Sequence, residues 1–241
     1  MPNNFFRFKQ FTIQQSHCAM KVCTDSCILG AWTSIRLKTA QEILDIGSGT
    51  GLLALMVAQK STARIVGIEY DAEAFAQSFE NISQSDWADR IKILEGDIRE
   101  FTFPQGYDFI ISNPPFFESD LRSPQKKKNE SKHSETLSLE ELIRSIRASL
   151  KQSGSFSILL PFHRTDYFEN LAALNGFHLQ EKMIIRQTHA HPPFRSILLF
   201  NYQKVASVLR NELVIKESTG KYSAAFMELM KDYYEERAFS T

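Results

Sequence analysis

From Glu42 onward, short runs of β-branched and aromatic residues alternate with amphipathic stretches. Such alternation is typical of crossover units, in which a helix follows each strand and the strands pair in parallel. The predicted strands cover residues 43–46, 64–69, 91–94, 107–112, 156–160, 178–185 and 196–202, and the predicted helices cover residues 52–59, 72–84, 139–150 and 165–174. The pattern therefore predicts an α/β fold with helices on both faces of a doubly wound sheet.

The last two predicted strands have no helical segment between them, and a turn containing Pro192 and Pro193 joins them. Strands joined in this way are expected to form an antiparallel hairpin. We therefore expect a seven-stranded, mostly parallel sheet with one antiparallel strand in its edge region.

The segments outside these units carry other signals. Residues 1–40 begin with an aromatic and basic run, and Thr24 is expected to cap a helix from Asp25 to about Trp32. Residues 221–236 predict one more amphipathic helix, and residues 117–136 form an insertion without apolar periodicity in which basic residues outnumber acidic ones. A length of 241 residues favours a single domain, with residues 1–40 as an extension, residues 41–241 as the core and a flexible basic insertion at 117–136.

Composition excludes several classes of function. Lys and Arg together number 28, as do Asp and Glu, so a polyanion would have to be bound by a local basic patch. No stretch approaches the about 18 apolar residues of a membrane helix, and the amino terminus lacks the apolar region of a secretory signal. Cys18, Cys23 and Cys27 are too close together to staple the fold, and their spacing matches no zinc or radical iron–sulfur motif. We expect a cytoplasmic protein without metal or membrane partner.

The first predicted strand runs into Asp45-Ile46-Gly47-Ser48-Gly49-Thr50-Gly51 and then into a helix. Glycines at such a turn let the backbone approach a ligand closely. Glu69 ends the next strand roughly 20 residues later, where related sheets place the acid that binds ribose hydroxyls. The dinucleotide-binding pattern would require glycine at Leu52, so the run instead resembles motif I of the class I S-adenosylmethionine-dependent methyltransferases.

This resemblance implies a Rossmann-like class I methyltransferase fold with S-adenosyl-L-methionine as cofactor. Asp97 follows the third strand and matches the residue that bonds the cofactor's adenine amino group. Asp45 is expected to act indirectly, by orienting the glycine turn or its waters. The implied cofactor-binding residues are Asp45, Gly47, Gly49, Gly51, Glu69, Asp97, Ile98 and Asn113.

The fourth predicted strand ends in Asn113-Pro114-Pro115-Phe116, at the sheet edge where α/β folds bind ligands. An amino group conjugated to a ring or carbonyl is a poor nucleophile because its lone pair is delocalised. The Asn113 side-chain oxygen and the Pro114 carbonyl can accept both amino hydrogens and direct the lone pair at a methyl group. The prolines restrict the turn, and Phe116 offers a face on which a flipped base can stack. These four candidate catalytic residues resemble the (Asn/Asp/Ser)-Pro-Pro-(Tyr/Phe/Trp) motif of amino-group methyltransferases.

The tetrapeptide alone does not select the substrate, but the ends of the chain resemble one family. Residues 8–11, 18–25, 29–32, 132–142 and 222–234 resemble segments of the bacterial tRNA1(Val) adenine-37 N6-methyltransferase family. Cys23 departs from the glycine expected after Lys21-Val22. The resemblance covers nearly the whole chain and implies methylation of N6 of adenosine-37 in the anticodon loop of a valine tRNA. A monomer is expected.

Such an enzyme needs local cations for phosphate, whereas a splayed loop base can enter a pocket. The lysine run in the insertion is either such a patch or a solvated loop, and His133 is either an RNA contact or an exposed loop residue. Lys21, Thr24 and Asp25 either close over the cofactor's methionyl end or belong to a capped surface helix. The RNA-binding candidates are Arg7, Lys9, Arg122, Lys126, Lys127, Lys128, Lys132, His133 and Arg195.

Other functions share parts of this pattern. Protein glutamine N5-methyltransferases and other RNA amino-group methyltransferases carry the same type of tetrapeptide. The former more often have tyrosine after the prolines and a dedicated amino-terminal helical domain, for which 40 residues are too few. A catalytically silent RNA-binding module is disfavoured because the glycine turn, Glu69 and Asn113 are all intact.

Overall fold

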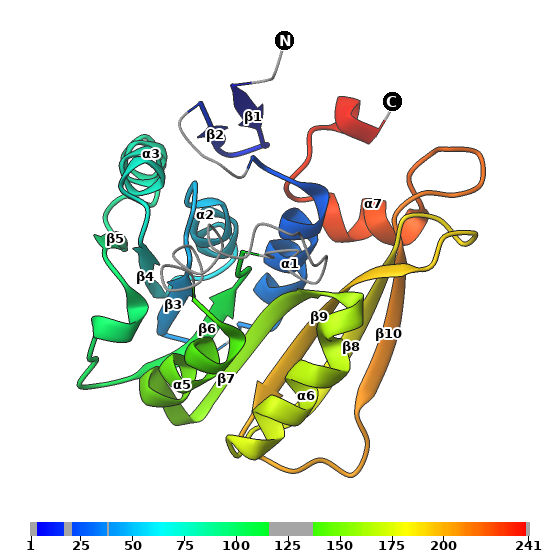
Figure 1. Ribbon diagram of the computed structural model, residues 1–241. Coiled ribbons are helices and arrows are strands. Elements are labelled where there is room, and N and C mark those ends of the chain that lie inside the picture. The colour runs from blue at the N-terminus through cyan, green and yellow to red at the C-terminus, as the bar shows by residue number, and fades with distance from the viewer. Residues whose placement is uncertain (1–3, 17–20, 38, 116–136, 240–241) are drawn as a thin grey trace, which may run out of the picture.

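The computed structural model describes residues 4–16, 21–37, 39–115 and 137–239. At its centre lies an eight-stranded sheet in the order β10-β8-β9-β7-β6-β3-β4-β5 (Figure 1). Its strands are β3 (Glu42–Ile46), β4 (Arg64–Glu69), β5 (Ile91–Glu95), β6 (Tyr107–Ser112), β7 (Leu150–Pro161), β8 (His178–Arg186), β9 (Pro193–Asn201) and β10 (Leu209–Val214). The helices are α1 (Thr24–Ser34), α2 (Leu52–Ala58), α3 (Ala72–Ser83), α5 (Leu139–Ser149), α6 (Thr165–Leu174) and α7 (Ala224–Met230), with short 3-10 turns η1 (Ile98–Glu100), η2 (Phe162–Arg164) and η3 (Glu236–Phe239).

Seven of the strands match those predicted from the sequence, and β10 is the eighth. The sequence pattern missed β10 because its first four residues are exposed, so the strand lacks a regular apolar alternation. The predicted antiparallel hairpin of β8 and β9 is confirmed. However, β9 also pairs antiparallel with β7 and therefore lies inside the sheet, because β8 and β10 extend the sheet beyond it.

Both faces of the sheet are buried, in agreement with the predicted helices on both faces. Ile43 and Leu44 are neighbours in β3, yet they belong to different hydrophobic clusters because successive side chains of a strand point to opposite faces. Ile110 and Ile111 divide in the same way in β6. Helices α1, α2, α3 and α7 supply side chains to one cluster, and α5 and α6 supply the other (Figure 1).

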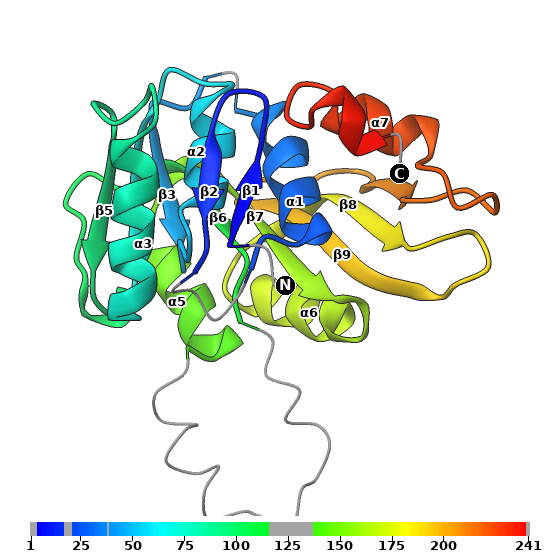
Figure 2. The ribbon, with the colours of Figure 1, turned by 90° about the horizontal axis from the view of Figure 1, so that it is seen from above.

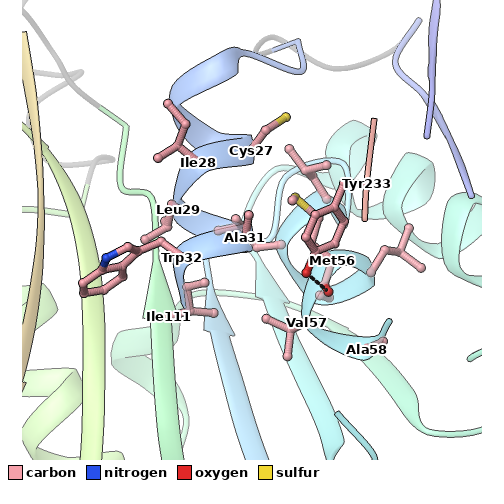
Figure 3. Close-up of a cluster of buried hydrophobic side chains, with 14 of the residues drawn as sticks. Cys27, Ile28, Leu29, Ala31, Trp32, Met56, Val57, Ala58, Ile111 and Tyr233 are labelled. Atoms are coloured by element: carbon pink, nitrogen blue, oxygen red, sulfur yellow. Dashed lines mark hydrogen bonds between the residues drawn. The ribbon is translucent and has the colours of Figure 1, made fainter. Parts of the chain in front are cut away.

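The two chain ends pack together over the layer formed by α1 and α2. Two short antiparallel strands, β1 (Phe5–Arg7) and β2 (Thr12–Gln14), form a hairpin above this layer (Figures 1 and 2). Phe8 is 1% exposed and stacks on Phe11 with ring centroids 4.5 Å apart. In the carboxyl-terminal segment, the Tyr233 hydroxyl donates a hydrogen bond of 3.0 Å to the Met56 carbonyl of α2 (Figure 3). The aromatic residues near the amino terminus therefore pack largely in the hydrophobic core.

Two local expectations are wrong at helix ends. Thr24 does not cap the first helix but is its first residue, and Cys23 occupies the N-cap position without a side-chain capping bond. The predicted carboxyl-terminal helix is shorter than expected, because α7 ends at Met230 and the chain turns before η3 begins at Glu236. Among the residues that the structure describes, no helix is long and apolar enough to cross a membrane.

Candidate active site

The glycine turn connects the end of β3 to the start of α2 in a left-handed backbone conformation. The φ angles of Gly47, Gly49 and Gly51 are 75°, 56° and 79°, a region in which a residue with a Cβ atom is strained. A Cβ atom added to Gly47 or Gly49 would meet nothing within 4 Å, so this backbone faces open space. The N–H of Gly49 donates to Glu69 Oε2 at 2.7 Å. The turn therefore presents accessible backbone beside a carboxylate, which fits a ligand that carries hydroxyl groups.

Asp45 lies beneath this turn with no exposed surface. Its Oδ2 atom accepts a hydrogen bond of 3.0 Å from the Ser48 hydroxyl. Burial raises the pKa of Asp45 to about 7, an effect that the Ser48 hydroxyl opposes and the nearby charge of Glu69 reinforces. Because the carboxyl group is fully covered, it can shape the glycine turn but does not face a ligand directly.

The side chain of Asn81 in α3 holds the turn from the other side. Its Nδ2 atom donates to the carbonyl groups of Thr50 and Gln14, both at 2.9 Å. Its Oδ1 atom accepts the N–H of Gln14 at 2.8 Å. Asn81 therefore ties the glycine turn to strand β2. No sequence pattern indicates this role, since both partners are more than thirty residues away along the chain.

Two acids follow the neighbouring strands. Glu69 ends β4, and its Oε1 atom accepts the N–H of Asp71 at 2.9 Å. Asp97 follows β5 and caps η1 by accepting the N–H of Arg99 at 2.9 Å. Since β4 pairs in parallel with both β3 and β5, the glycine turn, Glu69 and Asp97 all leave the same edge of the sheet.

Arg99 organises the acid after β5, although it was not among the residues predicted for the site. Its Nε atom lies 2.9 Å from both carboxylate oxygens of Asp97, and its Nη1 atom lies 2.9 Å from Glu141 Oε1 in α5. The guanidinium group lowers the pKa of Asp97 and keeps it ionised. An acid and an arginine two residues apart are the sequence pattern from which this pairing could have been predicted. A hollow of about 300 Å³, lined partly by Ile98 and Arg99, opens between η1 and α5.

The Asn-Pro-Pro corner begins where β6 ends, directly beside the glycine turn. Ile46 of β3 and Ser112 of β6 are register partners, and the Ser112 hydroxyl donates to the Ile46 carbonyl at 2.9 Å. The strand order reverses between β3 and β6 (Figure 1), and ligands of open α/β sheets bind at such a switch point. Gly47 and Asn113 therefore leave adjacent strands on the same side.

Asn113 is half-buried and is held by α1. Its Nδ2 atom donates to the Ser26 hydroxyl at 2.8 Å. Pro114 is buried and Pro115 is exposed, whereas Phe116 lies outside the described residues. The structure thus brings the amide of Asn113 to the start of a helix that is 87 residues away along the chain.

The start of α1 is anchored by an ion pair. Arg195 Nε, at the beginning of β9, lies 2.8 Å from Asp25 Oδ2, and the two side chains are 28% and 11% exposed. Arg195 was a candidate for RNA binding, and in the structure it forms this ion pair with Asp25. Lys21 is exposed and Thr24 is half-buried next to the same helix start.

The remaining RNA-binding candidates divide into two groups. Arg7 Nε lies 3.2 Å from Glu235 Oε1, and Lys9 Nζ donates to the Lys231 carbonyl at 2.6 Å, so both cations contact the carboxyl-terminal segment. Arg122, Lys126, Lys127, Lys128, Lys132 and His133 lie outside the described residues. Within the described ranges, no group of three or more His, Cys, Asp or Glu side chains is arranged to hold a metal ion.

Comparison with known sequences points to methyltransferases. The family model described as "Methyltransferase small domain" matches residues 31–175. A tRNA1(Val) (adenine(37)-N6)-methyltransferase of Dyadobacter fermentans is 46% identical over 239 residues, which is 97% of this chain and 99% of that protein. Proteins of the same name from Bacteroides fragilis and Tolumonas auensis are 35% and 37% identical over 97% of this chain and over 99% and 98% of their own lengths.

Solved structures share the fold at low sequence identity. A predicted O-methyltransferase from Agrobacterium tumefaciens is similar with a TM-score of 0.65 and 16% identity, over 86% of this chain and 96% of that one. The glycopeptide N-methyltransferase MtfA, solved with S-adenosyl-L-methionine, is similar with a TM-score of 0.54 and 11% identity, over 73% of this chain and 87% of that one. The architecture is therefore that of class I methyltransferases.

Proposed function

The chain belongs to the tRNA1(Val) (adenine(37)-N6)-methyltransferase family, and from this premise we propose that it methylates N6 of adenosine-37 in the anticodon loop of tRNA1(Val). The methyl donor is S-adenosyl-L-methionine. The observation that carries the proposal is the pairing of Ile46 with Ser112, because it sets the glycine turn beside Asn113. A donor-binding turn and an amine-binding corner on adjacent strands are the arrangement that methyl transfer between two bound molecules requires.

The chain offers groups suited to each part of the donor. The open backbone at Gly47 and Gly49 admits a close ligand, and Glu69 is a carboxylate that can accept hydrogen bonds from ribose hydroxyls. Asp97, kept ionised by Arg99, accepts from an adenine amino group, and Ile98 is the next residue and the first of η1. We assign Lys21 and Thr24 to the methionyl end, since they border the helix that holds Asn113.

The acceptor amine is prepared by the Asn113 corner. Bound S-adenosyl-L-methionine supplies an electron-deficient methyl carbon on a sulfonium sulfur. Asn113 Oδ1 and the Pro114 carbonyl accept the two amino hydrogens, which directs the nitrogen lone pair and stabilises the positive charge that develops on nitrogen. No strong base is needed before transfer, because the amino proton becomes acidic only once the nitrogen has gained the methyl carbon as its fourth substituent.

The RNA partner is proposed from the family and from general recognition chemistry. A base in a single-stranded loop can leave its stack and enter a pocket, and local cations suffice to bind the phosphates. We keep Arg7, Lys9 and Arg195 as candidate phosphate contacts together with the six basic residues of the 117–136 insertion. The valine tRNA is the finer part of the proposal and rests on the names of the relatives. We place the activity in the cytoplasm, where tRNA is found.

The test uses purified protein, labelled S-adenosyl-L-methionine and total bacterial tRNA. The expected result is label in RNA, recovered by mass spectrometry as N6-methyladenosine at position 37 of tRNA1(Val). A transcript of that tRNA with guanosine at position 37 is the matched control and should stay unlabelled. Label at another RNA position, or in a protein glutamine, would overturn the proposed substrate, and no transfer to any acceptor would overturn the activity.

A further inference from the structure

The hydroxyl of Ser26 joins Asn113 to a polar group that the proposed reaction does not use. Ser26 is 5% exposed in the first turn of α1. Its Oγ atom lies 2.8 Å from Asn113 Nδ2 and 2.9 Å from the sulfur of Cys23. The neighbouring carboxylate of Asp25 is paired with Arg195.

The contact between Asn113 and Ser26 has a fixed direction. The amide nitrogen of Asn113 can only donate, so the Ser26 oxygen accepts its N–H and keeps the hydroxyl proton for a second contact. The Cys23 sulfur, 2.9 Å from Ser26 Oγ, is within reach to accept that proton. Burial and the charge of Asp25 raise the pKa of Cys23 to about 11, so this side chain is a neutral thiol beside Ser26.

The direction matters because an amide side chain has two different ends. Asn113 can face the acceptor amine with its oxygen, which accepts a hydrogen bond, or with its nitrogen, which would repel the amino hydrogens. We infer that Ser26 is a positioning residue: with its hydroxyl proton directed to Cys23, its oxygen accepts from Asn113 Nδ2 and so turns Oδ1 toward the amine. The inference rests on the proposed amino-group transfer and assigns a role to Cys23, which the sequence pattern left without one.

The start of α1, which carries Ser26, is held in place by hydrogen bonds and an ion pair. Asp25 Oδ1 accepts the backbone N–H of Ser26 at 3.1 Å, and Arg195 binds Oδ2 from strand β9. The start of α1 is therefore fixed to the sheet by a partly buried ion pair, and the Ser26 hydroxyl is fixed with it. A hydroxyl held in this way favours one of the two amide orientations of Asn113.

The test compares methyl transfer to tRNA by wild-type protein and two α1 variants. In Ser26→Ala we expect kcat to fall by about 10-fold, because the amide samples both orientations, while the Kd of S-adenosyl-L-methionine changes by less than about 2-fold. The matched control is Ser34→Ala, since Ser34 is also buried in α1 but donates to the Gly30 carbonyl. That variant should keep the wild-type kcat.

A second pair of variants separates orientation from folding. In Asn113→Asp both ends of the side chain are oxygens, so adding Ser26→Ala to it should change kcat by less than about 2-fold. Cys23→Ala should lower kcat by a few-fold, and Cys23→Ser should restore it because a hydroxyl can donate and accept. A full loss on adding Ser26→Ala to Asn113→Asp, or wild-type kcat in Ser26→Ala, would overturn the inference. Absence of tRNA methylation by the wild-type protein would instead overturn the proposed function.

Discussion

The Ser112 hydroxyl donates a hydrogen bond of 2.9 Å to the Ile46 carbonyl and so joins the last residue of β6 to the last residue of β3. Beyond this bond the two strands diverge into different loops, the glycine turn on one side and the Asn-Pro-Pro corner on the other. The relative position of the two loops is therefore set by the rigid sheet, as a site with oriented reactants requires.

The first prediction concerns Asn113. Asn113→Ala removes the side-chain acceptor of the amine, so kcat for tRNA methylation should fall by roughly 100-fold or more. The Kd of S-adenosyl-L-methionine, measured by calorimetric titration, should stay within a few-fold. Asn175→Ala, which removes an asparagine at the end of α6, is the control and should retain normal turnover. Unchanged turnover in Asn113→Ala would contradict the assigned role.

The second prediction concerns Glu69. Glu69→Gln loses a charged acceptor for ribose hydroxyls and for the Gly49 N–H, so the Kd of S-adenosyl-L-methionine should rise by roughly 10-fold or more. Glu95→Gln is a matched control, because Glu95 is the register partner of Glu69 on β5 and is exposed. Calorimetric titration of both variants measures these Kd values. An equal rise in Kd in the two variants would argue against a specific contact between Glu69 and the cofactor.

The third prediction concerns Asn81. Asn81→Ala leaves backbone groups of Thr50 and Gln14 without their partner, so the free energy of unfolding should fall by about 3 kcal/mol. The looser glycine turn should also weaken cofactor binding. Urea denaturation and calorimetric titration measure the two effects. Asn81→Asp keeps the acceptor for the Gln14 N–H but sets a buried carboxylate oxygen against the two carbonyl groups, so its loss should be at least as large as that of the alanine variant. A smaller loss would mean that the two bonds from Nδ2 contribute little.

The fourth prediction is a pH dependence of stability from Asp45. Its pKa is about 7 in the folded protein and 3.8 in a model compound, so the unfolded chain loses its proton first as pH rises. The protonated group therefore contributes fully to the free energy of unfolding below about pH 4. This contribution declines as the pH rises to about 7 and is absent above that pH. Asp45→Asn removes this decline and should be more stable than wild type by a few kcal/mol at pH 8, and by less at pH 5.

Asp108 supplies a control of opposite sign for that measurement. Burial acts to raise its pKa, but the ion pair with Lys151 and the N–H groups of Gln41 and Glu42 lower it overall. Asp108→Asn should therefore reduce stability at pH 7, and the loss should shrink toward pH 3. Urea denaturation of both variants at several pH values tests the pair. An effect of Asp45→Asn that is the same at pH 5 and pH 8 would show that Asp45 titrates normally.

The sequence by itself determined the features that are encoded locally. The alternation of apolar runs located seven strands and four helices because each element carries its own periodicity. The glycine turn and the Asn-Pro-Pro corner were visible because a sharp turn demands particular residues at consecutive positions. Strand β10 escaped because its exposed residues lack that periodicity.

Only the tertiary structure decided which side chains meet. Ser26 contacts Asn113, Arg195 contacts Asp25 and Asn81 contacts Thr50 across long stretches of chain, and nothing in the local pattern distinguishes these polar residues from those that lie on the surface. A hydrogen bond depends on a separation of about 3 Å, which the packing of whole helices on the sheet sets. Residue types and spacing can therefore predict the chemistry of this protein, whereas the orientation of its reacting groups is determined by tertiary packing.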